Sequence, residues 1–91
     1  IPDGFALRHI YPNPFNPSTT FVFTVPKNMN TPVSILIYDI TGRRVTTLTD
    51  QVYSAGTHRL QWNASNLGAG IYFTEFQAGQ VRQIKKVTLL K

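Results

Sequence analysis

Catalysis by side chains needs reactive groups at a workable spacing, and this chain of 91 residues carries few of them. The acidic side chains are Asp3, Asp39, Asp50 and Glu75. No two of them stand at a spacing that suits a pair of carboxylates working as acid and base. His9 and His58 fall on different expected strands, and no G-x-S-x-G motif supplies a nucleophile. We therefore expect no enzymatic activity and no catalytic residue.

Metal and cofactor binding have equally little support in the sequence. The chain has no cysteine, which excludes zinc fingers, thiol catalysis and a small disulfide scaffold. It also lacks a D-x-D-x-D-G run and any pair of histidines at ligand spacing. One alternative stays open, a calcium ion held in a loop by backbone carbonyls together with Asp39 or Asp50. No other metal and no cofactor is expected.

The net charge of +5 is the strongest bias in the composition. Much of it comes late, since no acidic residue follows Glu75 while Arg82, Lys85, Lys86 and Lys91 do. No aromatic side chains interleave with these charges, so a nucleic acid is not an expected partner. No apolar run approaches the roughly 20 residues of a membrane-spanning helix. The first residues lack the pattern of a signal peptide, and Ile1 indicates a piece of a longer chain.

Short alternations of apolar and polar residues recur about every ten residues between turn signals, which predicts an all-β chain. The expected strands are 5–10, 19–25, 33–38, 43–49, a run around 58–62, 71–77 and 81–90. About seven antiparallel strands predict an immunoglobulin-like β-sandwich, with a small closed barrel as the alternative. We assign residues 1–91 to a single domain, in which 1–6 are a linker remnant.

Turn residues separate these strands. Three prolines, at 12, 14 and 17, fix φ and remove backbone donors, so 11–17 is predicted to be a loop. Residues 39–42, ending in Gly42, predict the turn of a hairpin. Residues 63–68 look like one helical turn, in which Asn63 suits the N-cap.

Five segments of the chain resemble the C-terminal sorting domains of proteins exported through the bacterial type IX secretion system. They are YPNPFNPSTT (11–20), IYDITGR (37–43), His58 with WNA (62–64), Leu67 with GIY (70–72), and KKVTLLK (85–91). Each segment alone is a weak signal, whereas five in register are specific. An immunoglobulin-like domain of flagellar hook-capping proteins shares the general pattern, but the basic and apolar final strand favours the sorting domain.

The resemblance implies a role in export and attachment. Such domains end large exported proteins of the Bacteroidota, including glycoside hydrolases and proteases, and outer-membrane secretion machinery reads them in the periplasm. A sortase-like peptidase commonly removes them and joins the cargo to anionic lipopolysaccharide at the cell surface. The chain is therefore expected to pass through the periplasm to the cell surface or the medium, covalently joined to an upstream cargo domain. The family usually has aspartate where this chain has Asn63, a change that should not disturb folding.

The resemblance also implies roles for particular residues. The expected secretion signal is Lys85, Lys86, Val87, Leu89, Leu90 and Lys91. A plainer explanation is an edge strand whose lysines prevent aggregation, and both roles are compatible. The other motif residues are expected to be mainly structural: Pro12, Asn13, Pro14, Phe15, Gly42, Trp62, Gly70 and Tyr72. Tyr72 is expected to fill the core while its hydroxyl finds a backbone partner, as in a tyrosine corner.

Two other functions stay open. A surface tryptophan can stack on sugars, which would make the domain a carbohydrate-binding accessory module of a polysaccharide-degrading enzyme. Trp62 shares a face with His58 and Leu60, however, so we expect it in the core. A structural immunoglobulin-like module is the other alternative. Independently, an outward-facing apolar patch is expected on two neighbouring strands, formed by Leu36, Tyr38, Ile71 and Phe73.

Overall fold

The computed structural model describes residues 4–27 and 30–90 and contains seven strands. They are β1 (Ala6–Tyr11), β2 (Ser18–Val25), β3 (Pro32–Tyr38), β4 (Arg44–Val52), β5 (Gly56–Asn63), β6 (Gly70–Ala78) and β7 (Val81–Leu89). The described residues contain no helix. The strand positions predicted from the alternation of apolar residues are confirmed to within a few residues at each end.

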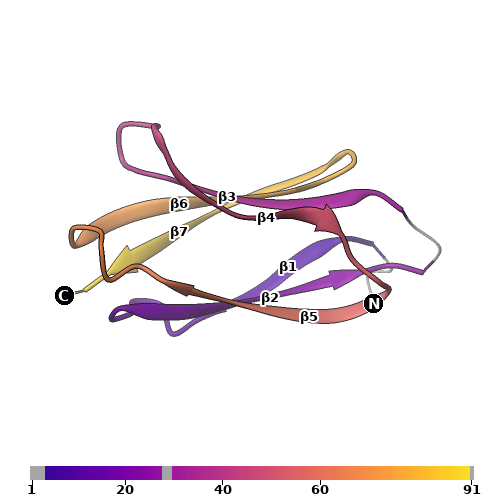
Figure 1. The fold of residues 1–91 in the computed structure, drawn as a ribbon, viewed down its shortest axis with the longest axis horizontal. Helices are drawn as coiled ribbons and strands as arrows, with labels where there is room; N and C mark the ends of the chain where they lie inside the picture. Colours follow the sequence, from indigo (N-terminus) through magenta and orange to yellow (C-terminus); the bar gives the residue numbers. More distant parts are fainter. Residues whose placement is uncertain (1–3, 28–29, 91) are drawn as a thin grey trace.

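The strands form two antiparallel sheets, ordered β1-β2-β5 and β4-β3-β6-β7. Figure 1 shows them as two stacked layers, with β3, β4, β6 and β7 above β1, β2 and β5. The prediction of an all-β immunoglobulin-like sandwich is confirmed. In the constant-type immunoglobulin arrangement the fourth strand joins the sheet of strands one, two and five, whereas here β4 pairs with β3.

The core lies between the sheets because every second side chain of each strand points inward. Phe21 and Phe23 of β2 are fully buried on one side of the core, and Ile35 of β3 and Phe76 of β6 are fully buried on the other. Burying a side chain of this size stabilises the fold by roughly 1.5–3 kcal/mol. The alternation that predicted the strands therefore also positions the core.

The connection between β5 and β6 is not helical, so the expected helical turn at 63–68 is wrong. Asn63 Oδ1 accepts a hydrogen bond from Ser65 N at 2.9 Å, and Leu67 N donates to Ala64 O at 3.0 Å. These bonds make an Asx turn followed by a tight turn. Ala64 is buried, and its amide donates to Pro17 O at 2.9 Å. This bond ties the connection to the loop before β2.

Both ends of the chain extend past the described residues. The predicted linker 1–6 begins with three residues that lie outside them, while Phe5 is buried in the core and Ala6 opens β1. Lys91 also lies outside the described residues. The described ends lie at opposite ends of the long axis, which measures 40 Å (Figure 1). Within the described residues, no helix could cross a membrane.

Candidate functional site

The predicted secretion signal maps onto β7, the edge strand of the four-stranded sheet. Its side chains alternate, so Val87 and Leu89 are buried at 0% and 1% exposure. Lys85 is half-buried and Lys86 is exposed, while Leu90, just beyond the strand, is 49% exposed. Three residues of the signal therefore reach solvent, and two belong to the core.

The loop before β2 is hydrogen-bonded to the free edge of β7. Asn13 Nδ2 donates to Lys86 O and Asn13 Oδ1 accepts from Thr88 N, each at 3.1 Å. Phe15 N donates to Thr88 O at 2.9 Å, and Leu90 N donates to Phe15 O at 2.8 Å. Phe15 and Leu89 accordingly form a parallel bridge. Four hydrogen bonds close the carboxyl half of this edge. We call them the loop clamp.

Aromatic packing in the core holds the loop of the clamp in place. Phe15 is 1% exposed, and its ring centre lies 5.4 Å from that of Trp62. Trp62 also packs against Phe21 and, edge to face, against Tyr72 at 6.2 Å. Because Trp62 is 6% exposed, its ring is not presented to solvent as a sugar-stacking platform would be. Pro12 and Pro14 are exposed on either side of Asn13, and Pro12 O accepts a hydrogen bond from Thr19 Oγ1 at 2.7 Å.

The remaining motif residues, Gly42, Gly70 and Tyr72, lie in turns or bond to them. The Tyr72 hydroxyl donates to Gly68 O at 2.7 Å, across the turn that leads into β6. Gly70 opens β6 with φ of 148° and Gly42 ends the β3–β4 turn with φ of 89°. These backbone angles favour glycine, because a Cβ atom is strained there. The two glycines therefore shape the turns, and Tyr72, buried in β6, bonds to the turn before its own strand.

An open basic cleft of about 370 Å³ separates β1 from β7. Its lining includes Arg8, His9, Tyr11, Lys85 and Lys86. Between the same two strands the Gln83 side chain accepts a hydrogen bond from Leu7 N at 2.7 Å, which ties β1 to β7. Arg8 lies at a bulge in β1, where the register shifts between Leu7 and His9. The lining of this cleft therefore contains basic side chains and no carboxylate.

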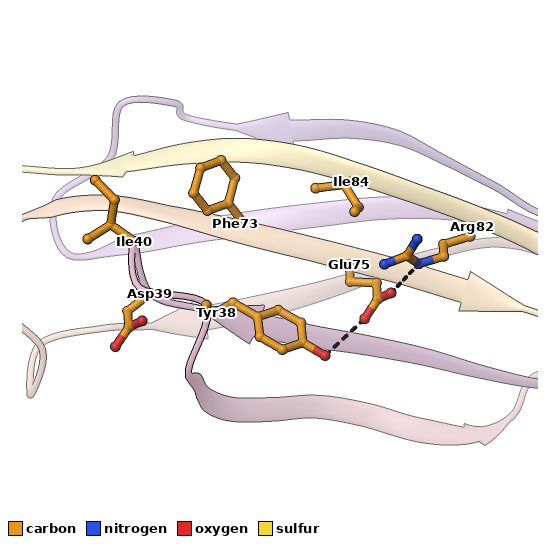
Figure 2. A pocket seen from close by; sticks show the side chains of 8 residues that line it. Tyr38, Asp39, Ile40, Phe73, Glu75, Arg82 and Ile84 are labelled. Carbon is orange, nitrogen blue, oxygen red and sulfur yellow. Dashed lines mark hydrogen bonds and ion pairs between the residues drawn. The ribbon is translucent and has the colours of Figure 1, made fainter.

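The outer face of the four-stranded sheet carries a second hollow, of about 350 Å³ (Figure 2). Tyr38 and Phe73 are cross-strand partners on β3 and β6, as the predicted patch requires. None of the four predicted patch residues is buried, and Ile71 is 37% exposed. The hollow extends the patch with Ile40 and Ile84, which are 70% and 54% exposed.

A chain of polar side chains crosses this face from β3 to β7. The Tyr38 hydroxyl donates to Glu75 Oε1 at 3.0 Å, and Arg82 Nε forms an ion pair with Glu75 Oε2 (Figure 2). The hydrogen bond from Arg82 holds the pKa of Glu75 below its ordinary value, against the opposing effect of burial. The same carboxylate raises the pKa of Tyr38 through the hydrogen bond that it accepts. Tyr38 and Arg82 therefore stabilise the ionised form of the Glu75 carboxyl group, which links three strands.

Of the two carboxylates considered for a loop calcium, Asp50 is exposed on β4, whereas Asp39 bonds within its own turn. Asp39 Oδ1 accepts hydrogen bonds from Thr41 N and Arg43 N at 3.0 Å and from Thr41 Oγ1 at 2.6 Å. The Thr41 hydroxyl is the main reason that the pKa of Asp39 is lowered. In the part of the chain that the structure describes, no three side chains of the metal-binding types gather. Asp39 instead orders the β3–β4 turn.

Two contacts were not foreseen from the sequence. The loop clamp joins Asn13 to Lys86 and Thr88, which lie 73 and 75 positions further along the chain. No local sequence pattern predicts such a pairing. The Tyr38–Glu75–Arg82 chain joins three strands in the same way. A hint existed for the second, because Glu75 is the one acidic residue in the apolar run of β6 and needs a cationic partner.

Residues 9–90 match the family model described as the secretion system C-terminal sorting domain. The match spans β2 to β7 completely and ends at Leu90, one residue beyond β7. It includes the loop clamp, Trp62 with the aromatic side chains packed on it, and all the described residues of the predicted signal. No curated protein matches the chain.

Proposed function

The chain belongs to the family of secretion system C-terminal sorting domains, and from this premise we propose that outer-membrane machinery reads it as the secretion signal and attachment module of a larger bacterial protein. Membership makes the chain a sorting signal of type IX secretion and the protein that carries it an exported one. The observation that carries the proposal is the match over residues 9–90.

The segment that the machinery contacts is the exposed part of β7 and its end. Lys85, Lys86 and Leu90 supply the contacts, because their side chains reach solvent on an edge strand. Val87 and Leu89 act indirectly, by anchoring the strand in the core. Lys91 extends the same basic and apolar run.

The loop clamp limits how a receptor can engage this strand. Strand addition needs free backbone groups along an edge, and both backbone groups of Thr88 already bond to the loop. A receptor that leaves the clamp intact therefore reads side chains at 85–90 and the adjoining prolines, or adds its strand nearer to Arg82 and Ile84. The clamp supports recognition of the folded domain rather than of a loose tail.

The remaining steps follow the family's implied route. The upstream cargo, a glycoside hydrolase or another exported protein, is joined before β1, at the end of the long axis opposite Leu90 (Figure 1). A sortase-like peptidase then separates the cargo from this domain and leaves it at the cell surface. The opposite placement of the two ends supports this arrangement, because a receptor at β7 does not crowd the cargo.

The test is export of the parent protein from a bacterium with a type IX system. Lys85→Gln, Lys86→Gln and Leu90→Ser are combined in the full parent chain, since these changes leave the core untouched. Surface-exposed cargo should fall about tenfold or more, because each 1.4 kcal/mol lost in binding is a factor of ten. The missing cargo should accumulate in the periplasm, where fractionation and immunoblotting detect it.

The matched control removes two charges and one exposed apolar side chain elsewhere. Lys27→Gln, Arg59→Gln and Val52→Ser do this, since all three side chains are exposed and lie away from β7. The control should be exported normally. Equal export of both triple variants, with unchanged melting temperatures, would refute the assignment of the signal to 85–90.

A further inference from the structure

The outer face of the four-stranded sheet carries apolar side chains that no described element covers. The sandwich has two layers, so each sheet has one face in the core and one toward solvent. On this solvent face, Tyr38, Phe73, Ile40 and Ile84 line the hollow of about 350 Å³. That volume is at the lower end of the roughly 300–1,000 Å³ of ligand pockets. A contiguous apolar surface of this kind marks an interaction site.

The strand register arranges charge around the two aromatic side chains. Four side chains form a row across the sheet. Arg44 of β4 pairs with Tyr38 of β3, Tyr38 pairs with Phe73 of β6, and Phe73 pairs with Lys86 of β7. Partners in register share a face, so the row is cation, aromatic, aromatic, cation. With neighbouring strands about 4.8 Å apart, the two cations stand about 14 Å from each other at the backbone.

The carboxylates of this face are already occupied. Glu75 is paired with Arg82 and accepts from Tyr38, and Asp39 is paired with Arg43 at 3.2 Å. Arg82 uses Nε for its pair, and its side chain is 60% exposed, so its terminal nitrogens still face solvent. The face therefore presents surplus positive charge from Arg44 and Lys86 around an apolar centre, while the charge of Arg82 is balanced by Glu75.

We propose that this outer face docks an extended segment of a partner protein, in which one aromatic or large aliphatic side chain stands between two carboxylates. The carboxylates pair with Arg44 and Lys86, and the apolar side chain enters the hollow beside Phe73 and Ile84. An extended segment rises about 3.4 Å per residue and points every second side chain the same way. Carboxylates four residues apart, with the apolar residue midway, thus match the spacing of the row.

A second copy of this chain fits the face poorly. The net charge of +5 makes two copies repel, and an isologous contact would place the row of one copy against that of the other. The complementary charge pattern belongs to an acidic partner. The row shares Lys86 with the proposed secretion signal, but Arg44, Tyr38 and Phe73 lie outside 85–91, so this inference goes beyond that signal.

The test is an NMR titration of the ¹⁵N-labelled 91-residue chain with a defined peptide. The probe is acetyl-Glu-Ser-Phe-Ser-Glu-amide, whose two glutamates and phenylalanine share one face when extended. Saturable amide shifts should gather at residues 38–44, 71–75 and 82–86. Replacing both glutamates by lysine, or the phenylalanine by serine, should weaken binding about tenfold or more.

Variants of the protein check the location. Arg44→Gln and Ile84→Asp should each weaken binding of the probe about tenfold, since one removes a cation and the other places an anion in the hollow. Arg59→Gln, on the other sheet, is the matched control and should change nothing. Shifts centred on Arg8 and Lys85, equal binding of the lysine peptide, or no saturation would each overturn the proposal. So would self-association through the same face, seen as shifts that depend on protein concentration without the probe.

Discussion

The two halves of β7 differ although they form one strand. Residues 87–90 are fixed from both sides, because Val87 and Leu89 fill the core while the loop clamp bonds the free edge. Residues 81–86 send Arg82, Ile84 and Lys86 into solvent, and no strand of the described residues pairs with their free side, where the clamp reaches only Lys86 O. The two halves therefore have different roles. The carboxyl half stabilises the fold, and the preceding half exposes side chains that a partner can contact.

This contrast changes how a truncation is understood. Deleting 85–91 removes contact residues together with Val87 and Leu89, so a loss of export would reflect unfolding as well as lost recognition. Single substitutions can separate the two. Changes in the carboxyl half should lower stability, whereas changes at exposed positions of the first half should leave stability nearly unchanged.

Leu89→Ala should have the largest effect on stability. Leu89 is 1% exposed, and a Leu→Ala change in a core costs about 2–5 kcal/mol through lost transfer energy and the cavity left behind. Ile84→Ala, on the same strand but 54% exposed, is the matched comparison and should cost less than about 1 kcal/mol. Chemical denaturation of the two variants measures the difference. Similar costs at both positions would remove the contrast between the halves.

Much of this architecture was available from the sequence. The alternation at Phe21, Phe23, Ile35 and Ile37 predicted the strands and their inward faces, because burial acts residue by residue. The sheet to which β4 belongs and the loop clamp were not predictable in this way. They depend on which distant backbone groups meet once two layers have packed, and hydrophobic period carries no such information.

The candidate site was predictable in part for the same reason. Motif spacing placed Lys85 to Leu90 on the last strand, and alternation grouped Tyr38 with Phe73. Neither signal predicts that Asn13 bonds to the backbone of β7. Neither predicts the hydrogen bond from Ala64 N to Pro17 O.

Asn13→Ala should have an intermediate effect and sharpens the contrast from the loop side. The change removes the hydrogen bonds to Lys86 O and Thr88 N, which stabilise the fold by about 1–2 kcal/mol together at this exposed edge. Asn13→Asp keeps the acceptor for Thr88 N and loses only the donor, so it should recover part of the stability. Hydrogen exchange should show faster exchange of the Thr88 amide in the alanine variant. Exchange that stays slow would mean that the clamp does not hold this half.

Glu75→Gln should have the smallest effect, and it depends on pH. The variant removes the ion pair with Arg82, whose side chain is largely exposed, so the cost at neutral pH is about 1 kcal/mol or less. The folded pKa of Glu75 lies below its ordinary value of 4.5, so the ion pair contributes fully above that value. The contribution is lost as pH falls through the folded pKa. Denaturation of both proteins from pH 7 to pH 3 should show the difference shrinking below about pH 4.5, and a constant difference would contradict the pairing.

The loop clamp also sets an order for folding. Its donors and acceptors come from residues 13–15 and 86–90, so more than 70 residues of chain must be available before either partner can bond. Contacts so distant in sequence slow folding, because the entropy of closing the intervening loop is lost before any contact forms. Until β7 has been synthesised, β6 lacks its neighbour at the sheet edge and Phe15 lacks the strand that it bridges. The sandwich is therefore completed only after residues 86–90 have been synthesised.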